Sequence, residues 1–180
     1  MKLNIDPDQF IERVTEAKDP IVSLIKGHLF IEAGLIELIK LACVNQDTFD
    51  PATLNFPNKV RLASALGLIE KDEIRPFLFL NDLRNSLAHH LDKDLNPNDG
   101  RRLYSMLRKT ERFAFALQHH PVLKRDPDYI NPNEFPDILH ICLIHFVAIL
   151  DVSITHFRTR NPAKPTLPFT PAFYSREKRP

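Results

Sequence analysis

The chain has 180 residues, 43% hydrophobic and 26% charged, and this composition is typical of one ordinary globular domain. Its 24 basic and 23 acidic residues leave a net charge of +1. That balance excludes a protein that attracts nucleic acid by its total charge, so any nucleic-acid surface has to be local. The two cysteines, Cys43 and Cys142, exclude a disulfide scaffold and favour a reducing compartment.

The sequence offers no clear membrane or export signal. Its first 20 residues are polar and acidic, whereas a signal peptide needs an apolar stretch. The longest apolar run, HICLIHFVAIL, is shorter than the roughly 20 residues that span a bilayer. We therefore expect a soluble, cytoplasmic protein that makes no contact with a membrane.

Apolar residues recur at intervals of three and four, and only 4 glycines are available for hairpins, so the sequence predicts an all-α, up-and-down bundle of five to six helices. A short opening helix is expected near residues 8–17. Asp19 and Pro20 then supply the cap and first position of a helix that reaches about Ala42. The apolar stripe expected on that helix comprises Ile21, Leu24, His28, Leu35, Ile39 and Ala42.

The remaining elements follow from proline, glycine and capping residues. A polar connection over 45–55 precedes a short helix that opens at Pro57 and ends at Gly67. Further helices are predicted from Asp72 to about Leu91, from Asn96 and Pro97 to about Gln118, and from about Glu134 to Phe157.

Residues 1–157 would thus form a single helical domain and residues 158–180 a proline-rich extended tail. The tail has six basic residues and one acidic residue, a charge of +5, which leaves −4 on residues 1–157. A tail of this kind is most often a solvated terminus, and the alternative is an arm that binds phosphates or a partner.

The predicted fifth helix has a cationic side. On an ideal helix its basic residues fall within an arc of about 120°, opposite an apolar face. Such a side is usually solvated, and the functional alternative is contact with an RNA backbone. The candidate RNA-binding residues are Arg101, Arg102, Arg108, Lys109 and Arg112.

The segment FLFLNDLRNSLAHH, residues 77–90, carries the most informative group of residues. Arg84 has a fixed positive charge, whereas His89 exchanges a proton near neutral pH. Those are the two functions needed to cleave RNA without a metal, namely a base for the ribose 2′-hydroxyl and a cation for the developing phosphorane charge. Residues five apart lie about 140° apart on a helix, so a single chain would make a poor site, although the length of the arginine closes part of the gap. Two copies across a twofold axis would bring two arginines and two histidines into one cleft.

Arg84, Asn85 and His89 form an RNxxxH element, and this element resembles the signature of the HEPN superfamily. Residues 20–91 are also similar to the mannitol operon repressor-like proteins, and this similarity is most specific over residues 56–89. The positions that carry this similarity are Phe56, Lys59, the Ala65–Ile69 stretch ALGLI, Arg84, Asn85, Ala88 and His89.

The resemblance implies a helical bundle with a cleft at a homodimer interface. Many such proteins are metal-independent endoribonucleases that act as toxins, in defence or in RNA processing, with RNA as substrate and no cofactor. It implies that His89 is the general base or acid, that Arg84 stabilises the transition state, and that Asn85 orients the phosphate or the histidine. Other members are non-catalytic and bind a regulatory protein, an antitoxin or nucleic acid, so that function is the alternative.

Other candidate groups have structural explanations. His28 and Glu32, four apart, would be a proton relay or, more often, a hydrogen-bonded histidine at the edge of the core. His140 and His145, five apart, cannot chelate one metal from the same helix. The adjacent histidines His119 and His120 are expected to form a helix cap or a surface feature. The sequence has no GxxxxGK[ST], GxGxxG, HExxH or CxxC motif, so we expect no metal site and no nucleotide cofactor.

Overall fold

A computed structural model describes residue 17 and residues 19–45, 47–89, 94–113 and 135–160. Every regular element in these ranges is helical, which confirms the all-α prediction. The expected opening helix at 8–17, the pair 119–120 and tail residues 161–180 lie outside the described residues, apart from Ala17.

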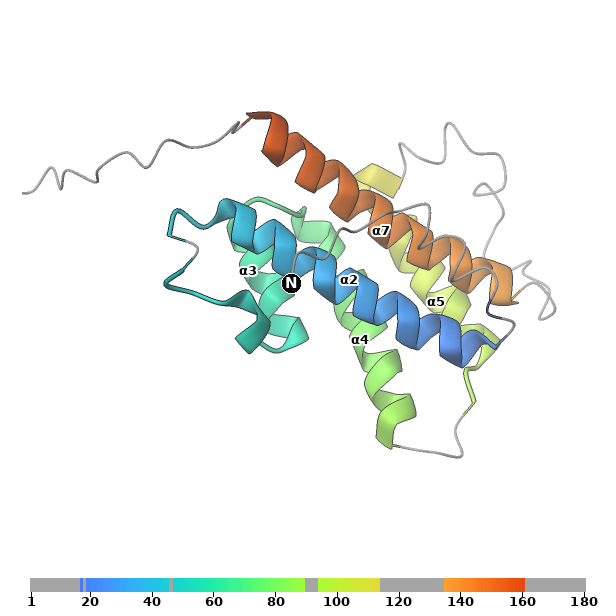
Figure 1. The fold of residues 1–180 in the computed structure, drawn as a ribbon. Coiled ribbons are helices and arrows are strands. Elements are labelled where there is room, and N and C mark those ends of the chain that lie inside the picture. Colours follow the sequence, from blue (N-terminus) through green and yellow to red (C-terminus); the bar gives the residue numbers. More distant parts are fainter. Residues whose placement is uncertain (1–16, 18, 46, 90–93, 114–134, 161–180) are drawn as a thin grey trace, which may run out of the picture.

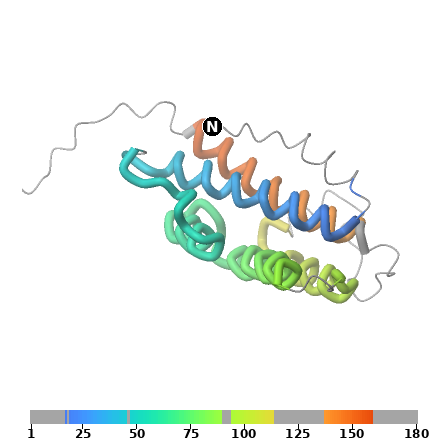
Figure 2. The backbone as a smooth tube through the Cα atoms, turned by 60° about the horizontal axis from the view of Figure 1, so that its bottom comes forward, coloured from blue at the N-terminus to red at the C-terminus, as the bar shows by residue number. Residues whose placement is uncertain are grey.

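The helices form two layers (Figures 1 and 2). One layer is the pair α2 (Pro20–Ala42) and α7 (Phe135–Arg160), and the other contains α3 (Phe56–Ala65), α4 (Ile74–His89) and α5 (Pro97–Leu107). Contacts between α2 and α7 show that these two helices run parallel. Near their starts the Ser23 hydroxyl lies 3.0 Å from His140 Nε2, and near their ends Arg158 pairs with Glu37.

Helix α2 begins and ends where the sequence predicts. The Asp19 carboxylate accepts a hydrogen bond of 2.8 Å from the Ile21 N–H, and Pro20 occupies the first turn, where its missing N–H costs nothing. The helix ends at Ala42. In the expected stripe Leu24, His28, Leu35 and Ile39 are buried, while Ile21 and Ala42 are partly buried.

Gly27 allows α2 and α7 to approach closely. A Cβ atom added there would lie 2.6 Å from a side-chain methyl of Leu143, which is itself fully buried. A leucine at this position has no room, because its side chain would have to displace the core of the neighbouring helix. We expect Gly27→Leu to lower the free energy of unfolding by about 3 kcal/mol in urea denaturation. Lys26→Leu at an exposed position on α2 is the control, and equal stability of both variants would contradict this packing.

Helix α3 is set by its two caps. Asn55 accepts a hydrogen bond of 2.9 Å from the Asn58 N–H, so the helix begins at Phe56, one residue before the predicted Pro57. At its end Gly67 has φ of 69°, and the N–H groups of Gly67 and Leu68 donate to the carbonyls of Ser64 and Ala63. This Schellman arrangement confirms the glycine stop.

Two short 3-10 turns add to the predicted elements. The turn η1 (Pro51–Thr53) lies within the segment predicted as an irregular polar connection, and Asp50 caps it. The turn η2 (Lys71–Glu73) contains Asp72, the predicted start of the next helix, so that α4 itself begins at Ile74. The described part of α4 ends at His89, and the predicted end near Leu91 lies outside the described residues.

The predicted fifth helix is wrong in length, because α5 ends at Leu107 and not near Gln118. Thr110 is the physical cause. Its hydroxyl donates to the Leu107 carbonyl at 2.8 Å and accepts from the Phe113 N–H at 3.4 Å, so it closes one helix and caps the short helical segment 111–113. Asn96 and Asp99 form the capping box expected at the start of α5.

Helix α7 extends past the predicted Phe157 to Arg160, so the first three residues assigned to the tail are helical. By length and composition the span Asp137–Thr159 is apolar enough to cross a membrane. However, 67% of its most apolar window is buried inside the bundle, as expected for the central helix of a packed core. Two histidines, His140 and His145, interrupt the apolar sequence of this helix, so the core has to accommodate them.

Candidate functional site

Helix α4 positions all three residues of the RNxxxH element. Leu80, Leu83 and Leu87 anchor the helix in the core at spacings of three and four. Arg84 and Asn85 are half-buried, while His89, the last helical residue, is exposed. On the helix Asn85 and His89 lie on nearly the same side and Arg84 about 140° from His89. One chain therefore presents the arginine and the histidine in different directions.

Asn85 holds the Arg84 side chain. The guanidinium Nη1 donates to the Asn85 Oδ1 at 3.1 Å. This bond orients the planar guanidinium group, whose five donors suit the oxygens of a phosphate. The asparagine thereby has a defined local role, whereas sequence reasoning had assigned it to the phosphate or the histidine.

A buried histidine lies behind Arg84. His28 of α2 is only 4% exposed, stacks on Phe56 with ring centroids 4.3 Å apart, and places Nε2 3.3 Å from Asn81 Oδ1. Burial lowers the pKa of His28, and this effect outweighs the hydrogen bond to Asn81 and the Glu32 charge, which both raise it. The neutral ring is therefore favoured in the folded state. Of the two predicted explanations for His28, the hydrogen-bonded core histidine is the one that these contacts support.

Glu32 is engaged elsewhere and does not pair with His28. Its carboxylate accepts a hydrogen bond of 2.7 Å from Lys59 Nζ, which also donates to the Leu54 carbonyl. The Lys59 side chain is 2% exposed. An ammonium group buried to this degree needs such partners, because an unpaired charge in the core is costly. Lys59, noticed in the sequence only through the family resemblance, thus fastens α3 to α2.

The break after Leu107 divides the predicted cationic side. Arg101, Arg102 and Lys109 line one hollow beside α4, together with Arg75, which sequence reasoning had missed. The Arg108 guanidinium instead lies over the Tyr104 ring, 6.0 Å from its centroid. The prediction that five cations share one side of a single helix is therefore wrong, because that helix does not continue to Arg112.

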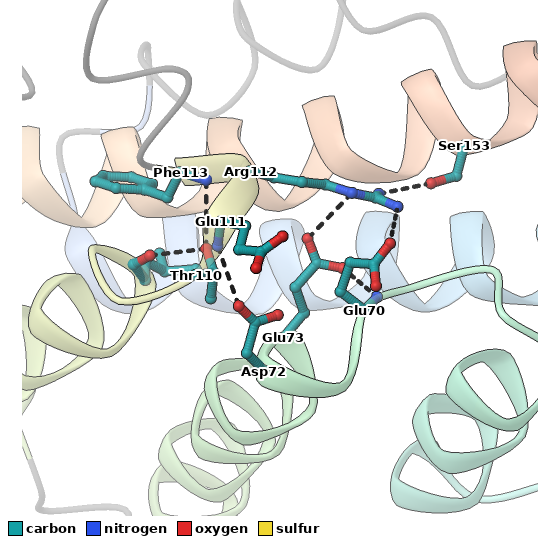
Figure 3. A network of polar contacts seen from close by, with 9 residues as sticks. Glu70, Asp72, Glu73, Thr110, Glu111, Arg112, Phe113 and Ser153 are labelled. Atoms are coloured by element: carbon teal, nitrogen blue, oxygen red, sulfur yellow. Dashed lines mark hydrogen bonds and ion pairs between the residues drawn. The ribbon is translucent and has the colours of Figure 1, made fainter.

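The Arg112 side chain links its own helical segment to the η2 turn and to α7 (Figure 3). It donates to the Ser153 hydroxyl of α7 at 2.9 Å and forms ion pairs with Glu70 and Glu73 at 3.5 and 3.6 Å. Burial raises the pKa of Glu73, whose side chain is 1% exposed. A backbone bond from the Glu111 N–H to Asp72 at 3.0 Å fastens the same segment. Arg112 is thus committed to holding the bundle together.

The two buried histidines of α7 point to different neighbours. His140 contacts Ser23, while the His145 ring meets the edge of Phe113 with centroids 4.5 Å apart. Within the part of the chain that the structure describes, no three His, Cys, Asp or Glu side chains gather as a metal site, and Cys43 and Cys142 are free thiols.

His145 makes stability dependent on pH. Burial, with a smaller contribution from the Arg112 charge, lowers its pKa from 6.5 to about 4. The neutral ring is therefore favoured in the folded state, and its contribution is present above pH 6.5 and lost as the pH falls toward 4. Between pH 7.5 and 5 we expect this group alone to remove about 2 kcal/mol of unfolding free energy.

Urea denaturation at both pH values tests that expectation. His145→Leu keeps an apolar side chain in the core but cannot be protonated, so its stability should fall less between pH 7.5 and 5 than that of the wild type. His156→Leu, which alters an exposed histidine of the same helix, is the matched control. An identical pH dependence for all three proteins would contradict the assignment.

Comparison with known proteins adds no relative: no family model, no curated protein and no solved structure matches this chain.

Proposed function

We propose that the chain is a metal-independent endoribonuclease of the HEPN type, in the toxin, defence or RNA-processing class. The observation that supports this proposal is the arrangement at the end of α4. There Asn85 orients the Arg84 guanidinium through a bond of 3.1 Å, and His89 is exposed to a substrate. A fixed cation and a side chain that can accept and return a proton are the minimum needed for RNA cleavage by the adjacent hydroxyl.

In the proposed reaction His89 removes the proton of a ribose 2′-hydroxyl, and the resulting oxygen attacks the neighbouring phosphorus. Arg84 stabilises the negative charge that develops on the phosphoryl oxygens. The bond from phosphorus to the 5′ oxygen breaks, and that oxygen takes a proton from a histidinium. The products end in a 2′,3′-cyclic phosphate and a 5′-hydroxyl.

The proposed site draws on two copies of the chain. Because Arg84 and His89 of one α4 diverge by about 140°, we infer that a homodimer places Arg84 of one protomer opposite His89 of the other. Three apolar side chains on α2 support such an association. Val22, Ile25 and Leu29 are 38%, 41% and 57% exposed and lie on one side of the helix, at spacings of three and four.

The second candidate function is a non-catalytic module that binds a regulatory protein or an antitoxin. The same exposed α2 residues favour it, because an apolar surface serves a foreign partner as well as a second copy. In that case Arg84 and His89 would have structural roles only, and the protein would not cleave RNA.

Cleavage of labelled structured RNA by the purified protein in excess EDTA separates these two functions. Fragments that carry 2′,3′-cyclic phosphate ends are the expected result. A folded protein that leaves several different RNAs intact would contradict the nuclease and favour the binding module.

A further inference from the structure

A positively charged groove runs between α4 and α5. It consists of two adjoining hollows of about 480 and 370 Å³, which share Arg75, Arg102 and Met106 in their walls. In the first hollow these cations are joined by Arg101 and Lys109. The hollows are within the size range of ligand-binding clefts in proteins. We call this feature the α4–α5 groove.

The charge of the groove is only weakly compensated. Arg75, Arg102 and Lys109 form no ion pair with any acidic residue that the structure describes. The Asp72 carboxylate at one end of the groove accepts a hydrogen bond from the Glu111 N–H. Cations gathered in a concave surface raise the local concentration of anions, so the groove suits a negatively charged ligand.

An aromatic ring accompanies these cations. Phe79 lines the second hollow, and the Arg102 guanidinium lies over its ring at 4.6 Å from the centroid. This contact fixes the guanidinium at the wall of the groove, and a guanidinium group is well suited to bind phosphate oxygens. Grooves that combine cations with aromatic or guanidinium planes are typical of single-stranded nucleic-acid binding.

The groove is aligned with His89. Arg75, Asp82 and His89 are successively seven residues apart on α4, so each lies within about 20° of the last. Arg75 and Asp82 line the groove, and His89 lies about 10 Å farther along the same side of the helix. A strand that occupies the groove and continues along α4 therefore reaches the proposed general base.

We propose that the α4–α5 groove binds the phosphates of single-stranded RNA and guides the strand to His89. This inference rests on the proposed function for its choice of RNA, and it names Arg75 and Lys109 as phosphate-binding residues. It also predicts the effect of Asp82, whose negative charge near the end of the groove repels the phosphates of the strand and so weakens binding.

Binding is measured without cleavage by using a fluorescein-labelled single-stranded RNA with 2′-O-methyl groups, which lack the attacking hydroxyl. In the full chain, Arg75→Ala/Lys109→Ala should weaken binding in fluorescence anisotropy roughly tenfold. The slope of log affinity against log salt should become shallower by about 1.4, the value for two lost phosphate contacts on a single strand. Asp82→Asn should tighten binding.

The matched control is Lys26→Ala/Arg61→Ala, which removes the same two charges from exposed positions on α2 and α3. Equal affinities of the two double variants, or no binding by the wild type, would overturn the groove. Binding of inorganic phosphate that Arg75→Ala/Lys109→Ala abolishes, while the same variant keeps the wild-type affinity for RNA, would also overturn the assignment to RNA. Because cleavage plays no part, loss of binding in the groove variant supports the groove even if the nuclease proposal fails.

Discussion

Replacing His89 by alanine is expected to lower the rate of RNA cleavage by a factor of about 100 to 10,000, the usual contribution of a general acid or base. The fold should remain intact, because His89 is exposed at the last position of α4. Product formation from a labelled RNA in excess EDTA measures the effect. His156→Ala, at an exposed position on α7, is the matched control and should cleave as the wild type does.

Arg84→Lys should also be impaired, although it keeps the positive charge. Lysine has no planar fork, so it cannot reproduce both the bond to Asn85 and a bidentate contact with a phosphate. Circular dichroism and gel filtration of each variant separate a lost group from a lost fold. Undiminished cleavage by folded His89→Ala would remove the proposed mechanism.

The largest expected loss of stability comes from Arg112→Ala. The substitution leaves the Glu73 carboxylate, 1% exposed, without its ion pair, and breaking a buried pair in this way costs about 3 to 5 kcal/mol. We expect a value near 3 kcal/mol, because the Arg112 side chain is 30% exposed and water screens part of the interaction. Urea denaturation at pH 7 is the measurement, with Arg61→Ala as a control at an exposed site.

Glu73→Gln distinguishes the lost ion pair from lost packing. If the orphaned charge causes the damage, Glu73→Gln should restore part of the stability of Arg112→Ala, with a coupling of more than about 1 kcal/mol in a double-mutant cycle. Burial raises the pKa of Glu73, so this carboxylate takes up a proton at a higher pH in the folded protein than in the unfolded chain. The loss caused by Arg112→Ala should therefore be smaller near pH 4.5 than at pH 7. Additive effects of the two substitutions would contradict this explanation.

The elements that sequence reasoning placed correctly are those with strong local signals. Asp19 and Pro20 start α2, and Gly67, in the left-handed conformation, ends α3. Each signal acts through hydrogen bonds to neighbouring backbone groups, so it can be read without knowledge of the fold.

The break at Thr110 was missed although its signal is also local. Apolar spacing continues past Leu107 to Phe113, and this periodicity concealed a threonine that caps a new helical segment. The position of Arg112 could not be read from such a pattern, because its partners Glu73 and Ser153 lie 39 and 41 residues away in the chain. Only packing brings those side chains together.

At the candidate site, too, local features can be predicted from the sequence, whereas contacts between distant segments cannot. Helix geometry alone predicted that Arg84 and His89 diverge, since both lie on one element. It gave no indication of His28 and Asn81 behind Arg84, because His28 belongs to α2. Nor could it bring together Arg75 of α4 and Lys109, which lies in the turn after α5.

Mixing two inactive variants tests most directly whether the active site is shared between two protomers. Arg84→Ala and His89→Ala proteins are unfolded together, refolded and assayed on RNA in EDTA. If each site combines Arg84 of one protomer with His89 of the other, roughly a quarter of wild-type activity returns, because half of randomly paired dimers are mixed and each holds one complete site of two. No recovery from refolded mixed dimers would contradict a site shared between two chains.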